Sequence, residues 1–315
     1  MWMILFSVAT LWILLPDPAW AYRDYLTSEQ KTQLAKIQTV LIDALALTDK
    51  GAADAGPIAE IASRGLRELA YTVVQDRTKP HDAVFKVKCE QRKTWEGTTA
   101  AGGDADLPDA PSRLWKGPAC QLTYFLGEMK IKWQKEVRTN VQDIPASVQS
   151  TQAEQAGTQV IASLAEALGK YDFPLLLTAE WGQPDRLLKL LDSAGTSQTR
   201  KVRIISLLGE MQADEALPRL KQALQDRNLS KEAAVALGNL GQEGIPILAN
   251  ILKTSNQPEL QAAAAKGLGT LGGLHGDGSV VDPLLSMLEA PGIDIRVQTE
   301  IVWALGKIID KRSLP

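Results

Sequence analysis

Four segments in the C-terminal part of the chain end in the same way, with a Leu followed by a Gly. The glycines are Gly209, Gly238, Gly269 and Gly306, at intervals of 29, 31 and 37 residues. Intervals of this length are typical of a repeated pair of helices and too long for a single repeated helix. No single pair can bury its apolar face alone, so the motif predicts a stack of helical hairpins.

Each Leu-Gly motif closes a predicted helix with one apolar stripe. The position five residues before the Gly is occupied by Ile204, Ala233, Ala264 and Ile301. The position nine residues before it is occupied by Leu229, Leu260 and Val297 in the last three copies, and by Arg200 in the first. Upstream of each helix lies another, with two Leu residues four apart and therefore on one face. These pairs are Leu187/Leu191, Leu220/Leu224, Leu248/Leu252 and Leu284/Leu288.

An apolar, Ala-rich second helix that closes on Ala-Leu-Gly resembles HEAT-type repeats, in particular the short HEAT-like repeats also found in phycobilisome lyases. The resemblance covers residues 183–315 and implies an α-helical solenoid. One position departs from the family's pattern, which often has Arg early in the second helix. Eight residues before the Gly, this chain has Lys201, Ser230, Gln261 and Gln298.

A stack of repeats leaves an extended surface built from the same helix of every repeat, and such surfaces bind partners. The repeats show no convergent acid, base and nucleophile. We therefore predict a non-catalytic scaffold that binds a protein partner on this surface and needs no cofactor, with Lys231, Glu232 and Lys266 among the contact residues. An enzyme subunit that binds a small ligand, as the lyase resemblance suggests, is the alternative.

The longest interval contains a Gly-rich insertion, Gly272–Gly278, with His275 and Asp277. These two side chains could form a partner contact or a weak metal site. A long loop followed by a helix cap at Asp277 or Ser279 is the simpler interpretation, and we favour it. No Lys follows the glycines, so a phosphate-binding loop is not indicated.

The chain begins with an apolar run, Trp2–Leu15, that is shorter than the ~20 residues a membrane-spanning helix needs. Pro16 and Pro18 follow, and then Ala19-Trp20-Ala21, whose small residues suit signal peptidase. We predict a signal peptide at residues 1–21, cleaved after Ala21, although no Lys or Arg precedes the run. This places the protein in the periplasm or outside the cell, with membrane contact only during export.

The chain has two cysteines, Cys89 and Cys120. Exported proteins meet an oxidising environment, and both residues fall on predicted strands, so we predict a disulfide; two small buried side chains are the alternative. Zinc is disfavoured because only His81 lies nearby in the sequence. The formal net charge of −3 gives no general attraction to nucleic acid.

Residues 22–147 are predicted to form a small α+β domain. Helices are expected at Ser28–Leu47 and Pro57–Val74, and the intervening Thr48–Gly56 is expected to be a loop. Three segments then alternate apolar and polar residues, which predicts an antiparallel sheet of about three strands. The segments are Phe85–Glu90, Cys120–Tyr124 and Met129–Gln134, with a type II′ turn at Gly127–Glu128.

Five basic residues would lie on the outer face of this sheet: Lys86, Lys88, Arg92, Lys130 and Lys132. They form either an anion-binding surface, joined by Trp95 and Trp115, or a solvated face that resists edge-to-edge association; we favour the second. Residues 148–182 are predicted to be a helical linker or a capping repeat, because Ala167-Leu168-Gly169 echoes the repeat motif.

Overall fold

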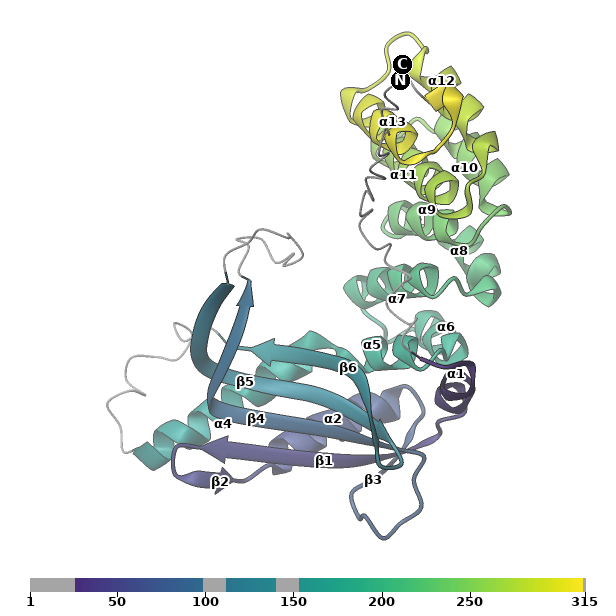
Figure 1. The fold of residues 1–315 in the computed structure, drawn as a ribbon. Helices are drawn as coiled ribbons and strands as arrows, with labels where there is room; N and C mark the ends of the chain where they lie inside the picture. The colour runs from purple at the N-terminus through teal and green to yellow at the C-terminus, as the bar shows by residue number, and fades with distance from the viewer. Residues whose placement is uncertain (1–25, 99–111, 140–152, 314–315) are drawn as a thin grey trace, which may run out of the picture.

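A computed structural model describes residues 26–98, 112–139 and 153–313 of the chain. The molecule has two arms, a sheet with its covering helices and a stack of helices that rises from one end of the sheet (Figure 1). The predicted signal peptide, residues 1–21, lies outside the described residues. No helix in the described ranges has the length and apolar character that a membrane crossing requires.

The sheet has six strands in the order β2-β1-β4-β5-β6, with β3 also beside β1. Their bounds are Thr39–Thr48 (β1), Gly51–Ala53 (β2), Thr72–Val74 (β3), Ala83–Thr98 (β4), Ser112–Leu126 (β5) and Met129–Arg138 (β6). The sheet is mixed, because β1 runs parallel to β3 and β4 while the other pairs are antiparallel. The expectation of a wholly antiparallel sheet is therefore wrong. It failed because β1 was not recognised as a strand.

The helix predicted at Ser28–Leu47 is also largely wrong. Only α1, Ser28–Ala35, is helical, and Thr39–Thr48 is the strand β1. Val40, Leu41 and Ile42 are consecutive and all buried, so this strand is covered on both faces. A strand buried on both faces loses the alternation of apolar and polar residues, and a short apolar run of this kind resembles a buried helix.

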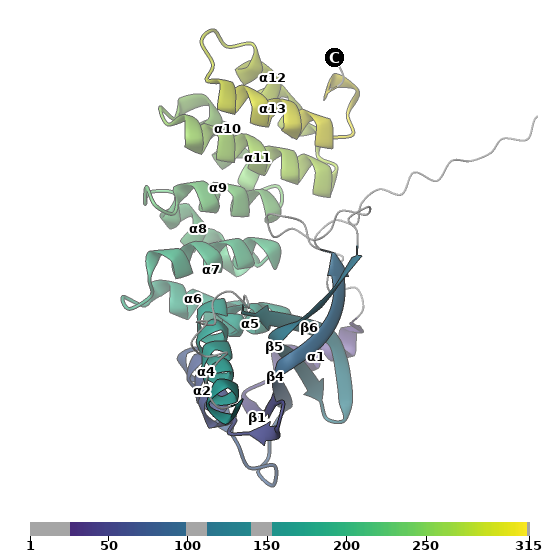
Figure 2. The same cartoon turned by 90° about the vertical axis from the view of Figure 1, so that its left-hand side faces the viewer.

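Helices α2, Gly56–Glu68, and α4, Ala153–Tyr171, lie side by side against the sheet (Figure 2). Helix α2 ends six residues earlier than predicted, at a turn where Ala70 has a positive φ of 61°, and the rest of the predicted helix becomes β3. The predicted loop before α2 contains β2. Helix α4, which ends near the Ala167-Leu168-Gly169 motif, packs on α2 and on strands β1, β4, β5 and β6. It therefore packs as part of the α+β arm, whereas the sequence motif grouped it with the following residues as a helical linker or capping repeat.

The predicted cysteine pair forms a disulfide in the structure. Cys89 on β4 lies directly opposite Cys120 on β5, with a Cα–Cα distance of 3.9 Å, and both are fully buried. The predicted hairpin turn is also confirmed, since Gly127 between β5 and β6 has a φ of +57°. The disulfide thus joins the two long central strands beneath the covering helices.

Helices from α5 onward form the second arm. Their bounds are Phe173–Glu180 (α5), Pro184–Asp192 (α6), Gln198–Glu210 (α7), Leu217–Ala223 (α8), Ser230–Asn239 (α9), Gly244–Thr254 (α10), Pro258–His275 (α11), Val281–Leu288 (α12) and Ile295–Lys307 (α13). Helices α6, α8, α10 and α12 are the first helices of the hairpins, and α7, α9, α11 and α13 are the second helices. Each second helix contacts the next one along the stack. The α-helical solenoid is confirmed.

The Leu-Gly motif explains how tightly the second helices pack. The Leu of each copy is buried, at Leu208, Leu237, Leu268 and Leu305. The Gly permits close contact: a Cβ added to Gly238 would lie 2.3 Å from the carbonyl oxygen of Gly267 on α11. Any side chain at this position would therefore force α9 and α11 apart.

The Gly-rich insertion is not a long loop. Helix α11 continues through Gly272 to His275, and the chain turns only at Gly276, whose φ is +64°. A Cβ on Gly272 would lie 2.7 Å from both Val280 and Ile308. Gly272 is therefore needed for the packing of α11 against Val280 and Ile308. The prediction of a long loop was wrong because a Gly-rich segment can also be helical where close packing requires it.

Candidate partner-binding site

The second helices line one side of the stack, which Figure 2 presents toward the viewer. Between α9, α11 and α13 this side is hollowed into a groove of about 470 Å³. We call it the second-helix groove. Its lining residues are Lys231, Glu232, Val235, Glu259, Ala262, Ala263, Lys266, Arg296, Thr299 and Glu300.

The floor of the second-helix groove is apolar and its walls are charged. Val235, Ala262 and Ala263 are small side chains on neighbouring helices, which brings the helices close and leaves the groove between the longer residues. The charges of the walls have both signs. A segment that fills this groove would need an apolar strip flanked by groups of both charges.

Arg296 connects two repeats at one wall of the groove. Its guanidinium donates to Glu259 on α11 and to Asp294, which also caps α13 by accepting from the backbone N–H of Arg296 at 2.9 Å. These hydrogen bonds lower the pKa of Asp294 to about 2. The pKa of Glu259 is lowered by a bond to its own backbone N–H and by Arg296. Both carboxylates are therefore charged near neutral pH and fixed in place.

The structure brings three of the predicted contact residues together. Lys231 and Glu232 come from α9 and Lys266 from α11, and all three line the groove. Sequence reasoning did not select Glu259 and Arg296. A signal was present, because each stands ten residues before the Gly of its own repeat, Gly269 and Gly306. Charged residues at equal repeat positions fall on the same side of the stack.

His275 and Asp277 do not line this groove. Asp277 caps the short 3₁₀ turn Gly278–Val280 by accepting from the backbone N–H of Ser279 at 2.9 Å, and it also accepts from Gln242 at 3.2 Å. The bonds from Ser279 lower the pKa of Asp277. The helix-cap interpretation of Asp277 is confirmed. Within the described ranges, no group of three or more His, Cys, Asp or Glu residues is placed to hold a metal ion.

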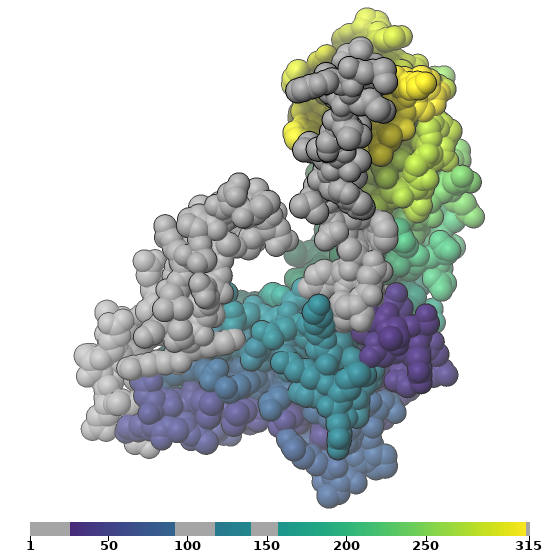
Figure 3. All heavy atoms as spheres, viewed as in Figure 1, coloured from purple at the N-terminus to yellow at the C-terminus, as the bar shows by residue number. Residues whose placement is uncertain are grey.

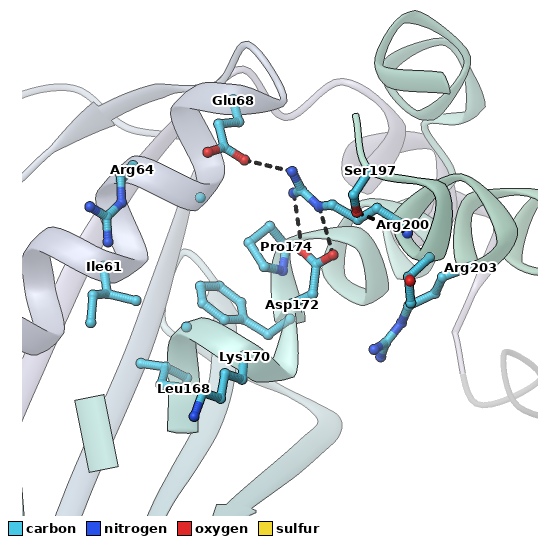
Figure 4. Close-up of a pocket in the computed structure, with 14 residues that line it drawn as sticks. Ile61, Arg64, Glu68, Leu168, Lys170, Asp172, Pro174, Ser197, Arg200 and Arg203 are labelled. Atoms are coloured by element: carbon cyan, nitrogen blue, oxygen red, sulfur yellow. Dashed lines mark hydrogen bonds and ion pairs between the residues drawn. The ribbon is translucent and has the colours of Figure 1, made fainter. Parts of the chain in front are cut away.

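A second hollow lies where the two arms meet, between α2, α4, α5 and α7 (Figure 4). Arg200 crosses it, donating to Asp172 at 2.7 and 3.1 Å and to Glu68 at 2.9 Å. This explains why Arg200 breaks the apolar stripe of the first repeat: its side chain ties the stack to α2 and to the start of α5. The ion pairs occupy the two carboxylates that line the hollow.

The outer face of the sheet carries paired charges. Lys86 lies 3.9 Å from Asp43, and Lys88 lies 2.9 Å from Glu90. Lys130 and Lys132 are exposed. Neighbouring carboxylates offset part of the positive charge, which favours a solvated face over an anion-binding surface. The side chains of Arg92, Trp95 and Trp115 lie outside the described part of the structure, although Trp95 and Trp115 are opposite each other in the strand register.

Comparison with known families decides what the stack is. The model of the HEAT repeats family matches residues 184–269 and 245–315. Residues 184–315 are HEAT repeats. The match begins at Pro184, the first residue of α6, and leaves α4 and α5 outside, in agreement with the packing of α4 on the sheet. A comparison with curated proteins finds no match for the chain.

Proposed function

We propose that this protein is an exported, non-catalytic scaffold that binds a protein partner in the second-helix groove. HEAT repeats are typical of interaction scaffolds, since their stacked helices expose a continuous surface. The observation that carries the proposal is the groove itself, which spans three repeats and combines an apolar floor with charged walls.

The exposed lysines of the groove indicate which charges a partner segment needs. Arg296 and Glu259 are bound to each other, so they shape the wall. Lys231 and Lys266 are exposed, and Lys231 also helps to lower the pKa of the neighbouring Glu259. A partner segment with carboxylates opposite these lysines and a small apolar strip between them would fit, as an amphipathic helix does in a hydrophobic groove.

Charge reversal in the groove tests the proposal. Lys231→Glu combined with Lys266→Glu should weaken partner binding by at least tenfold, because two favourable contacts become repulsive. The matched control is Lys221→Glu with Lys253→Glu, which reverses two exposed lysines on the first helices α8 and α10. Partners captured by the full chain from an envelope extract would be identified first, and calorimetry would then compare the two double variants.

Two results would contradict this proposal. Equal loss of binding in both double variants would point to a general charge effect. Unchanged binding in both would show that the groove is not the binding site. His275→Ala serves as a further arm, since loss of binding there alone would move the site to the end of α11. All variants change exposed residues, so unfolding should shift by less than about 0.5 kcal/mol.

Export is tested separately. The proposal rests on the apolar run Trp2–Leu15 and the Ala19-Trp20-Ala21 sequence. N-terminal sequencing of the protein from its own host should begin at Tyr22. An intact Met1 in the mature protein would exclude cleavage. Thiol labelling of that sample under denaturing, non-reducing conditions should find no free cysteine, and two labelled cysteines would contradict an oxidising location.

A further inference from the structure

The hollow at the junction of the two arms has more positive than negative side chains in its lining. The basic residues are Arg64, Lys170, Arg200 and Arg203, and the acidic residues are Glu68 and Asp172. The whole chain has a net charge of −3, so this excess of positive charge is local to the hollow. Its volume of about 410 Å³ is in the range of small-molecule binding sites.

Both acidic residues of the hollow are already paired within the chain. Arg200 donates to Asp172 at 2.7 Å and to Glu68 at 2.9 Å. One guanidinium thus offsets most of the negative charge of the lining. An anion that enters the hollow is therefore repelled little by these carboxylates, and the remaining basic residues can attract it.

Those basic residues come from both arms. Arg64 on α2 is exposed, and Arg203 on α7 lies over the ring of Tyr171, with its guanidinium carbon 5.9 Å from the ring centroid. Within the ranges that the structure describes, neither arginine forms an ion pair with a carboxylate. Lys170 on α4 pairs with Glu166 at 2.6 Å, but both side chains are exposed and solvent weakens the pair. Arg64 and Arg203 are therefore the two groups best placed to bind an anion.

The shape of the hollow indicates what kind of anion fits. Its floor includes the buried apolar side chains of Phe173 and Pro174. Figure 4 shows Arg64 and Arg203 on opposite sides of Pro174. Thr199, in the first turn of α7, also lines the hollow and stands four residues before Arg203, on the same face of the helix. A single small anion would contact one arginine only, whereas a ligand with anionic groups set apart would contact both.

We propose that this hollow binds a small anion with at least two carboxylate or phosphate groups. Arg64 binds one group from the sheet arm, and Arg203 with the start of α7 binds another from the stack, while the body of the ligand lies on Phe173 and Pro174. Because the two arginines belong to different arms, the bound ligand links the arms and stabilises their junction. The proposal does not depend on partner binding, since the second-helix groove is lined by other residues.

Calorimetry on the full chain tests the proposal with three probes: citrate, tripolyphosphate and inorganic phosphate. Citrate or tripolyphosphate should bind at least about tenfold more tightly than inorganic phosphate, because only an anion with separated charges reaches both arginines. Which of the two binds more tightly distinguishes a carboxylate ligand from a phosphate ligand. Absence of saturable binding by both at millimolar concentrations, or equal binding of inorganic phosphate, would overturn the proposal.

Arginine variants test whether the probe binds in the hollow. Arg64→Gln and Arg203→Gln should each weaken binding by roughly tenfold, since each removes a charge-assisted contact. Arg67→Gln is the matched control, because Arg67 is exposed on the same helix as Arg64 and does not line the hollow. Equal losses in Arg64→Gln and Arg67→Gln would indicate a general charge effect and refute the site.

A gain of binding is expected from one further variant. Glu68→Gln removes a negative charge from the lining and releases one nitrogen of Arg200, so it should strengthen binding by roughly threefold. The control is Glu60→Gln, an exposed glutamate on the same helix that lies outside the hollow. Damage to the fold cannot produce tighter binding. Unchanged or weaker binding by Glu68→Gln would contradict the assignment of the anion to this hollow.

Discussion

Two tryptophans of the helical arm, one beside the sheet and one on α13, have opposite surroundings, and the comparison shows how the stack is attached to the sheet arm. At the start, Trp181 is fully buried, in edge-on contact with the rings of Tyr71 at 5.2 Å and Tyr124 at 5.8 Å. On α13, Trp303 is 66% exposed, at the repeat position that Val235 and Lys266 hold beside the second-helix groove. Figure 3 shows the sheet arm against the start of the stack, with the rest of the stack projecting away from it.

Polar contacts also hold the start of the stack against the sheet arm. Gln183 donates from its side-chain amide to the carbonyl oxygens of Leu34 at 2.9 Å and Ile37 at 3.0 Å, and Arg186 donates to that of Leu69 at 2.6 Å. These bonds link residues at the start of the stack to backbone carbonyl groups at the ends of α1 and α2. The α+β arm therefore serves as the N-terminal cap of the solenoid, and it fixes the direction in which the stack projects.

The largest effect is expected where the two arms share their core. Trp181→Ala should destabilise the protein by about 3 to 5 kcal/mol, because it opens a cavity between the sheet and α5. Trp303→Ala should change stability by less than about 0.5 kcal/mol. Denaturant unfolding of both variants measures the difference. Equal effects would mean that Trp181 and Trp303 do not differ in their packing as described.

Within the stack, Leu237→Ala should cost about 2 to 5 kcal/mol, since the side chain is fully buried between repeats. Leu305 is its equivalent on α13 and is slightly less buried, at 6% exposed against 0% for Leu237. Leu305→Ala should therefore lie at the lower end of that range. The same unfolding experiment tests both, and a cost below about 1 kcal/mol for Leu237→Ala would place this residue outside the core.

The repeats could be predicted from sequence because their pattern is local and occurs four times. The buried Leu of each copy followed from spacing alone, without knowledge of any long-range contact. The strand β1 could not be predicted in this way. Its burial depends on segments that come later in the chain, among them α2 and α4, and a single apolar run carries no information about them.

The candidate site shows the same limit. Lys231, Glu232 and Lys266 were selected as exposed residues of the second helices, and these helices line one side of the stack. The contact between Arg296 and Glu259 was missed, since it joins two repeats and depends on the distance between α11 and α13. Arg200 was recognised only as an exception to the apolar stripe, and its partners Asp172 and Glu68 belong to another arm of the molecule.

Substitutions of the motif glycines should change stability by smaller amounts, and in opposite directions at Gly238 and Gly306. Gly238→Ala should destabilise the stack by about 1 to 3 kcal/mol, because the new Cβ would strike the backbone of Gly267. Gly306→Ala meets open space among the described residues and should be neutral or stabilise the fold by up to about 1 kcal/mol, the gain in helix propensity. Thermal unfolding distinguishes the two; a destabilising Gly306→Ala would show that this position is in contact with other groups.

The ion pairs of Arg200, at the junction of the two arms, should contribute less to stability than the packing contacts above. Arg200→Met should cost about 1 kcal/mol, because the guanidinium is partly buried and bonded to two carboxylates, but solvent screens part of the interaction. Arg219→Met is the matched control: Arg219 pairs with Asp192 in a more exposed position, and its loss should cost less than about 0.5 kcal/mol. Urea unfolding of both variants makes the comparison, and equal costs would mean that Arg200 does not tie the arms together.

The smallest effect on stability is expected at Asp294, which caps α13, and it depends on pH. Hydrogen bonds from Arg296 lower the pKa of Asp294 from its ordinary value of 3.8 to about 2. A carboxyl whose folded pKa is depressed contributes stability above its unfolded pKa, and that contribution disappears as the pH falls through the folded value. Asp294→Asn keeps a good helix cap and removes only the charge. The stability difference between wild type and this variant should therefore stay constant from pH 7 to about pH 4 and vanish by about pH 2. Denaturant unfolding across that range measures it, and a difference that persists at pH 2 would mean that the cap, and not the charge, sets the contribution of Asp294.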